Sequence, residues 1–251
     1  MSQNRNQHEY FQKAAMYDLL ANYYKYTDPN KHIAYYQQHL QNINLALQTM
    51  RTNMTQSATH PAKIRFVQAS FDTPNVDIYV NGTKVLKDFP YKEVSNYLSL
   101  HAGKYQIDIY PAGNMVSTIL SRKVVVEPGK HYTLITAGSA DKLKWVVLED
   151  NLRIPRGETK VRFIHLSPDA SAVDIAVKNG DVIFPQVSFR HATGYLGLSP
   201  MIVNLEARAA GTTDAVLTMP PIQFKPNEGY SILMIGSVKG EPALEAFVIN
   251  G

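Results

Sequence analysis

The sequence predicts a mainly β protein, with two tandem immunoglobulin-like antiparallel β-sandwiches preceded by an α-helical hairpin. Three observations lead to this prediction: a segment with strand-like alternation, its return later in the chain, and a helical period before both. The chain has 251 residues, of which 45% are apolar and 18% charged, and it contains no cysteine. It is therefore long enough to bury more than one core, and disulfides and thiolate chemistry are excluded.

An internal repeat defines the two sandwiches. The matching segments are Lys63–Asp72 with Lys160–Asp169, Val76–Val80 with Val173–Val177, and Tyr97–Leu100 with Tyr195–Leu198. An Asn-Gly pair follows the second segment in each copy, and all these landmarks keep their order. We interpret them as a tandem duplication, with domains at 63–150 and 160–251 and a linker near 151–159.

Each copy has the pattern of β-strands. Ile64 and Phe66 alternate with Arg65 and Val67, which is the period of two expected of a strand with one face on a core. Further short runs follow at spacings near 8–12 residues, separated by turns that contain glycine and proline. About seven such strands in each copy are typical of an immunoglobulin-like sandwich.

Residues 1–60 are predicted to form the helical hairpin. Asp28 and Pro29 supply an N-cap and a first-turn proline for the second helix, so the turn is expected near Thr27–Asn30. Apolar residues then recur in steps of three and four, and we name them the apolar stripe: Ile33, Tyr36, Leu40, Ile43, Leu47, Met50 and Met54. A shorter stripe marks the first helix: Tyr10, Ala14, Tyr17, Ala21 and Tyr24. We expect the apolar stripe to be buried, either against the first helix, with the hairpin folded against a sandwich, or against the same hairpin of a second chain.

The repeated segments resemble a known protein family. Ser167–Ile175 (SPDASAVDI) and Tyr97–Tyr105 (YLSLHAGKY) are similar to a bacterial family of unknown function, found as repeated immunoglobulin-like modules on envelope proteins. The resemblance covers about residues 63–250 and leaves the helical segment outside. It implies β-sandwiches and a surface location, with no assigned activity. The first copy departs from the family at Phe71, where the second has Pro168.

No pattern of catalytic, metal-binding or cofactor-binding residues is found, so we expect the protein not to be an enzyme and to use no cofactor. His32 and His39 are seven residues apart on one helix, but zinc sites prefer closer pairs with further ligands, and surface histidines are the favoured interpretation. Ser167 near His165 lacks the Gly-x-Ser-x-Gly context of a hydrolase nucleophile. Phosphate-binding glycine loops are absent from the sequence as well.

Charge and hydropathy narrow the range of partners. The net charge of +4 is spread along the chain, which argues against a nucleic acid partner, and no apolar run reaches the length of a membrane span. The first ten residues lack the apolar region of a signal peptide, so conventional secretion is not expected. The location stays open, with a spore or cell surface reached after cytoplasmic synthesis as one explanation.

Two further groups of residues attract attention. Arg65 with Asp77, and Arg162 with Asp174, occupy matched places in the two copies, and we predict that each pair meets across neighbouring strands. Four tyrosines are candidates for a ligand face that stacks on sugar rings: Tyr79, Tyr91, Tyr105 and Tyr110. Packing between strands is the other interpretation of these rings.

The sequence therefore favours a non-catalytic structural or adhesive protein of a bacterial surface layer, of which the spore coat is one. The helices would dock to a protein partner or self-associate. The alternative is a carbohydrate-binding module protein with a cell-surface or spore glycan as ligand.

Overall fold

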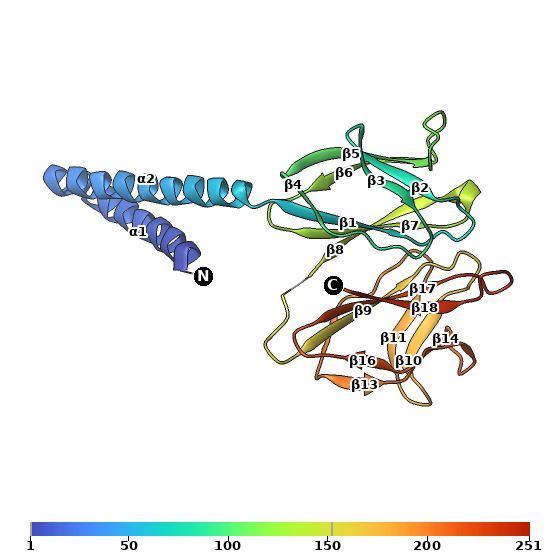
Figure 1. Cartoon of the computed structure of the whole chain (residues 1–251). Helices are drawn as coiled ribbons and strands as arrows, with labels where there is room; N and C mark the ends of the chain where they lie inside the picture. Colours follow the sequence, from blue (N-terminus) through green and yellow to red (C-terminus); the bar gives the residue numbers. More distant parts are fainter. Residues whose placement is uncertain (1, 152) are drawn as a thin grey trace. The chain divides into compact units, whose positions relative to one another are not determined.

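The computed structural model describes the backbone of residues 2–151 and 153–251, and the side chains of residues 8–50, 60–151 and 153–251. The chain divides into two compact units, Met1–Pro61 and Ala62–Gly251. The first contains two helices, α1 (Ser2–Tyr24) and α2 (Pro29–Thr59), and the second contains the strands (Figure 1). Neither helix, as far as its residues are described, is long and apolar enough to cross a membrane.

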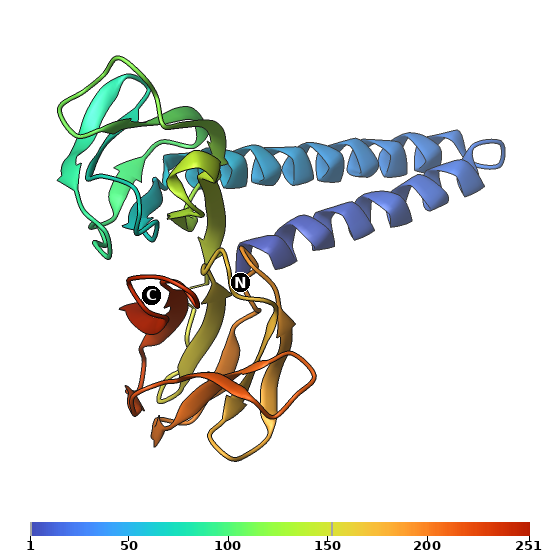
Figure 2. The ribbon, with the colours of Figure 1, turned by 90° about the vertical axis from the view of Figure 1, so that its right-hand side faces the viewer.

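The helical unit is the predicted hairpin. α1 ends at Tyr24 and α2 begins at Pro29, and Figure 2 shows the two helices side by side, joined by a short turn at one end. The carboxylate of Asp28 accepts a hydrogen bond of 3.2 Å from the backbone N–H of Lys31, as an N-cap residue does. The predicted start of α2 is therefore confirmed, and the turn occupies residues 25–28, slightly before the predicted Thr27–Asn30.

Residues 62–150 form the first sandwich, whose two sheets have the strand orders β4-β1-β7-β8 and β3-β2-β5-β6. The strands are β1 (Ala62–Gln68), β2 (Val76–Val80), β3 (Thr83–Phe89), β4 (Leu98–Leu100), β5 (Gly103–Pro111), β6 (Leu120–Val126), β7 (His131–Ala137) and β8 (Lys144–Asp150). A 3-10 turn, η1 (Ala140–Lys142), precedes β8.

Residues 159–250 form the second sandwich, with the orders β12-β9-β17-β18 and β11-β10-β14-β15 and a small β13-β16 sheet. The strands are β9 (Thr159–His165), β10 (Val173–Val177), β11 (Val182–Val187), β12 (Leu196–Leu198), β13 (Met201–Val203), β14 (Leu205–Ala209), β15 (Ala215–Thr218), β16 (Ile222–Phe224), β17 (Gly229–Ile235) and β18 (Glu245–Asn250).

The direction of one strand pair in each sandwich differs from the prediction. β1 pairs with β7, and β9 with β17, in parallel, while the other pairs are antiparallel. β7 follows β6 of the opposite sheet, and β17 follows β16 of the small sheet. Each enters beside the first strand of its own sandwich. Period-two alternation is the same for both directions, so the sequence pattern does not reveal the parallel pairs.

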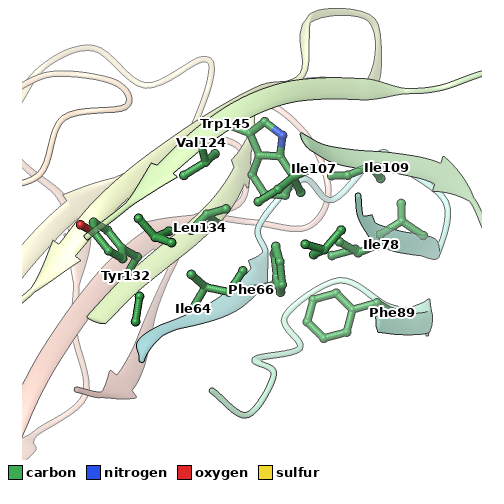
Figure 3. Packing of buried hydrophobic residues seen from close by; sticks show 14 residues of the cluster. Ile64, Phe66, Ile78, Phe89, Ile107, Ile109, Val124, Tyr132, Leu134 and Trp145 are labelled. Atoms are coloured by element: carbon green, nitrogen blue, oxygen red, sulfur yellow. The ribbon is translucent and has the colours of Figure 1, made fainter. Parts of the chain in front are cut away.

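Each sandwich has its own apolar core. In the first, side chains from the two sheets converge around Phe66, Ile107 and Leu134, which are essentially inaccessible to solvent, and Trp145 closes one side (Figure 3). The second core is built in the same way around Phe163, Ile175 and Ile232. The strand alternation of the sequence thus places one face of each strand in a core.

A third apolar cluster joins the two sandwiches. We call β4-β1-β7-β8 and β12-β9-β17-β18 the inner sheets, because their second faces meet. The cluster includes Val67 and Ile135 from the first inner sheet, and Ile164 and Leu233 from the second. β1 and β9 are therefore covered on both faces, and not on one face as the alternation predicted. This packing makes residues 62–251 one compact unit of four sheet layers.

Candidate functional site

The seam of the hairpin is made of small residues and histidines. Ala14, Ala21 and Ala46 are at most 2% exposed, so the two backbones approach closely. The Nδ1 atoms of His32 and His39 lie 2.9 and 3.0 Å from the backbone oxygens of Ala21 and Ala14. These histidines are thus half-buried seam residues that link α2 to α1, and they are not the surface histidines that the sequence predicted.

Aromatic rings extend the seam towards the turn. The ring of Tyr35 stacks on Tyr17 and Tyr24, with centroids 6.3 and 5.7 Å apart. Seen along α2, the seam consists of His32, Tyr35, His39, Asn42 and Ala46. These positions are offset by one or a few residues from the apolar stripe, so a different face of α2 meets α1.

The apolar stripe is consequently not covered by α1. Four of its members remain exposed, with exposed fractions of 53% for Ile33, 47% for Tyr36, 44% for Leu40 and 42% for Leu47. Ile43 and Met50 are half-buried. The side chain of Met54 lies outside the described residues. The first helix is therefore eliminated as the partner that would cover the stripe.

The surface around the stripe is poor in charge. Residues 29–59 carry only Lys31 and Arg51 as charged side chains. α1 adds exposed apolar side chains at Met16, Leu19 and Tyr23. An exposed row of apolar residues with few charges is typical of a protein interaction surface.

A second candidate site lies between the two inner sheets, where two arginines are buried. Arg65 in β1 donates from Nε to the Thr133 hydroxyl at 2.9 Å and from Nη1 to the backbone oxygen of Asn250. Arg162 in β9 donates from Nη1 to the backbone oxygen of Glu149 at 3.0 Å. Each arginine thus reaches from one sandwich to the last strand of the other.

Asp150 neutralises charge in this cluster. Its carboxylate accepts hydrogen bonds from Arg162 Nη2, from the Thr133 hydroxyl at 2.6 Å and from the Tyr97 hydroxyl at 2.7 Å. The rings of Tyr97 and Tyr195 cover the guanidinium groups of Arg65 and Arg162, at 4.9 and 4.7 Å. Burial, together with the Asp150 charge, raises the pKa of Tyr97.

The predicted pairs of Arg65 with Asp77 and of Arg162 with Asp174 are wrong. β1 and β2 belong to opposite sheets, as do β9 and β10, so these residues are not cross-strand neighbours. The matched positions belong to two separate arrangements, each of which recurs in both sandwiches.

Asp77 and Asp174 instead hold loops in place. Asp77 binds Lys84 Nζ at 2.6 Å and accepts from the backbone N–H groups of Asp88 and Gly113. Asp174 accepts from the equivalent N–H groups of Gln186 and Gly211, at 2.7 and 2.8 Å. The hydrogen bond from Lys84 lowers the pKa of Asp77, and that from Gln186 lowers the pKa of Asp174.

The four candidate ligand-face tyrosines do not share a face. Tyr79 and Tyr110 pack edge to face, 5.3 Å apart, and Tyr79 is only 4% exposed. Tyr105 packs against the first core, and Tyr91 against the cluster between the inner sheets. The set is therefore divided among three places, which favours the packing interpretation.

The repeated Ser-x-Asp turn is also structural. The Asp169 carboxylate accepts hydrogen bonds from the backbone N–H groups of Val238 and Lys239 and from the hydroxyls of Ser237 and Ser167. Burial opposes ionisation, but these donors outweigh it and hold the pKa of Asp169 at about 2.

The described residues hold no candidate metal centre. Among them, no three His, Cys, Asp or Glu side chains lie together in a way that could hold a metal ion. A cavity of about 200 Å³ opens in the second sandwich beside Phe184, Leu198 and Met201, and its lining is apolar. Such a lining offers a sugar no polar partner.

Sequence reasoning missed the cluster around Asp150. Tyr97 and Tyr195 could have been singled out from the sequence, because both belong to the repeated segments. In the structure each of them covers an arginine. Asp150 carries no such signal in the sequence, because the equivalent position in the second sandwich is Gly251. Its role depends on the packing of the two sandwiches, which no local pattern reveals.

Comparisons with known proteins find a family model for part of the chain and two distant solved structures. No curated protein matches the chain. The Bacillus anthracis TIE protein has 13% identity and a TM-score of 0.25 over 71% of this chain, which spans about a third (34%) of that structure. A candidate cell adhesion protein of Bacteroides fragilis has 9% identity and a TM-score of 0.18, over 76% of this chain and 97% of its own. Residues 62–176, from β1 into β10, match the family model of a domain of unknown function, DUF4397.

Proposed function

We propose that the protein is a non-catalytic structural or adhesive component of a bacterial surface layer, in which the helical hairpin makes the assembly contact. The observation that carries this proposal is the apolar stripe, which α1 leaves exposed at Ile33, Tyr36, Leu40 and Leu47. Burial of apolar side chains is the main favourable contribution to protein association. A surface of this kind is stabilised when a second protein covers it.

A second copy of the hairpin is the partner we favour. Two hairpins that meet through their stripes form a four-helix arrangement, and the low charge of α2 makes little repulsion between copies. The alternation of three and four residues between stripe positions suits the packing of one helix along another.

The sandwiches are proposed to be two copies of one immunoglobulin-like module. In support, the orders β4-β1-β7-β8 and β12-β9-β17-β18 correspond strand by strand, and so do the orders of the other large sheets. The match to DUF4397 ends at residue 176 and adds no support for the second copy. In the assembly the joined sandwiches would act as a rigid body that the hairpin links to its neighbours.

The spore coat is one layer that fits this proposal, because its proteins are made in the mother cell. A surface protein partner other than a second copy is the other form of docking. The mass of the purified protein in solution distinguishes docking to such a partner from self-association, because only self-association raises the mass when no partner is present.

Light scattering on the full chain, run beside a glycan array, tests the proposal. We expect a concentration-dependent rise in mass and no glycan signal. A monomer that binds a defined glycan, with binding lost in Tyr110→Ala, would favour the carbohydrate-binding alternative, for which the divided tyrosines give little support.

A further inference from the structure

The two sandwiches contact each other through equivalent arginines in a reciprocal manner. Arg65 Nη1 donates to the backbone oxygen of Asn250, and Arg162 Nη1 donates to that of Glu149. The strand registers agree with this equivalence, because Glu149 pairs with Tyr132 as Asn250 pairs with Tyr230. The contact is therefore close to two-fold symmetric, although the two halves belong to one chain.

The next residue breaks the symmetry. Asp150 follows Glu149, and its carboxylate binds Arg162 Nη2, the Tyr97 hydroxyl and the Thr133 hydroxyl. Gly251 follows Asn250 and offers no side chain. Because the strands of the two sandwiches are equivalent, each of the three donors to Asp150 has a counterpart on the other side of the contact. The counterparts are Arg65 Nη2, the Tyr195 hydroxyl and the Ser231 hydroxyl.

Two of these three donors are buried and unpaired. Within the part of the chain that the structure describes, neither Arg65 Nη2 nor the Tyr195 hydroxyl has a hydrogen-bond partner. The Arg65 side chain is only 6% exposed. Ser231 accepts from Arg162 Nε at 2.8 Å, as Thr133 accepts from Arg65 Nε at 2.9 Å, so the two hydroxyls occupy equivalent places in the two sandwiches.

The balance of buried charges also favours an additional anion at this place. The side chains of Arg65 and Arg162 are 6% and 3% exposed, and the nearby carboxylate is that of Asp150, which is fully buried. Asp150 Oδ2 lies 4.0 Å from Arg65 Nε, whereas Oδ1 is bonded directly to Arg162. Two buried cations thus share one anion, and an uncompensated buried charge is strongly unfavourable.

We propose that Arg65 Nη2, the Tyr195 hydroxyl and the Ser231 hydroxyl form a binding site for one carboxylate group at the junction of the two sandwiches. The carboxylate would occupy the place that the Asp150 side chain has on the other side of the contact. Guanidinium and hydroxyl donors suit the two oxygens of a carboxylate. Either a small free carboxylate or the terminal carboxylate of the expressed chain has this chemistry.

The response of stability to acetate tests the site. The urea unfolding midpoint of the full chain is measured in sodium acetate and in sodium chloride at equal ionic strength. The same measurement is made on a chain with a short neutral Gly-Ser extension after Gly251, which moves the terminal carboxylate away. A ligand that binds only the folded state raises the midpoint in a saturable manner.

We expect acetate to raise the midpoint of the extended chain relative to chloride, and Tyr195→Phe to reduce that shift. A similar shift in the unextended chain identifies a free carboxylate as the ligand. A shift confined to the extended chain identifies the chain's own terminus as the occupant. Both outcomes support the site.

A gain of stability gives an independent test. In the extended chain, Gly251→Asp should raise the unfolding midpoint above that of the matched Gly251→Asn variant and should abolish the acetate response. Equal midpoints for these two variants, together with identical behaviour in acetate and chloride, would overturn the proposal. This test does not depend on the hairpin or on its assembly.

Discussion

Arg162 in β9 and Asp150 in β8 form an ion pair across the boundary between the two sandwiches, with side chains that are 3% and 0% exposed. The apolar cluster around Val67 and Ile164 also belongs to this contact, as does the ion pair of Lys92 with Glu245. The sandwiches are thus fixed against each other by their inner sheets.

Replacement of Asp150 tests the importance of this pair. Asp150→Asn leaves two buried guanidinium groups without a counter-charge, so we expect a loss of about 3–5 kcal/mol in the free energy of unfolding. The control is Glu149→Gln, because Glu149 is 53% exposed where it binds Lys130, and exposed pairs contribute at most about 1 kcal/mol. Urea denaturation measures both, and equal losses would contradict the assignment.

The carboxylate of Asp77 is buried, so its replacement should lower the free energy of unfolding more than the loss of an exposed ion pair does. Asp77 is 1% exposed and accepts hydrogen bonds from two backbone N–H groups and from Lys84. Asp77→Asn should lower the free energy of unfolding by about 1–3 kcal/mol, because the side-chain NH₂ group of asparagine would then face a hydrogen-bond donor in place of an acceptor. Asp181→Asn, at an exposed carboxylate, should change stability little. Indistinguishable unfolding curves for the two variants would show that Asp77 does not hold the loops.

Asp169 should make stability depend on acid pH. Its pKa is about 2 in the folded protein, below the ordinary 3.8, so its contribution is complete above about pH 4 and is lost as the pH falls towards 2. The loss should not exceed about 1 kcal/mol, because the residue is largely exposed.

The measurement compares the unfolding free energy of the natural chain with that of Asp169→Asn between pH 7 and pH 2. The difference between the two should shrink below pH 4. A difference that stays constant over this range would show that Asp169 is not the titrating group. Ser237→Ala, which removes one donor, should move the transition to higher pH.

The hairpin seam should tolerate no larger residue at Ala46. This side chain is fully buried between the helices, so Ala46→Leu should destabilise the hairpin by about 1–3 kcal/mol through overpacking. Ala34→Leu is the matched control, because Ala34 is exposed on the same helix. The helical signal in circular dichroism, followed on heating, checks the prediction. If both variants melt alike, the seam is assigned to the wrong face.

The fold could be predicted from the sequence wherever a local pattern carries it. The alternation around Ile64 and Phe66 and the Asp28-Pro29 start of α2 are local signals, and both elements are confirmed. The parallel pairing of β1 with β7 depends on the path between the sheets, which alternation does not record.

The candidate sites were less predictable, because each depends on which face meets another element. Apolar periodicity identified Leu40 and Leu47, but small size and hydrogen bonding at Ala46 and His39 decide which face of α2 meets α1. The spacing of Arg65 and Asp77, which returns later in the chain, was misleading. Equal spacing shows that positions are equivalent and does not show that the two residues are in contact.

Sedimentation velocity on the full chain over a wide concentration range tests the central proposal most directly. We expect the natural chain to self-associate and the double variant Leu40→Asp, Leu47→Asp to remain monomeric. Gln37→Asp with Gln41→Asp is the control, because it adds the same charges at exposed polar positions of α2. Fluorescence of Trp145, the single tryptophan and part of the first core, confirms that the sandwiches stay folded. A natural chain that is monomeric throughout, or a control that dissociates as fully as the stripe variant, would contradict assembly through the apolar stripe.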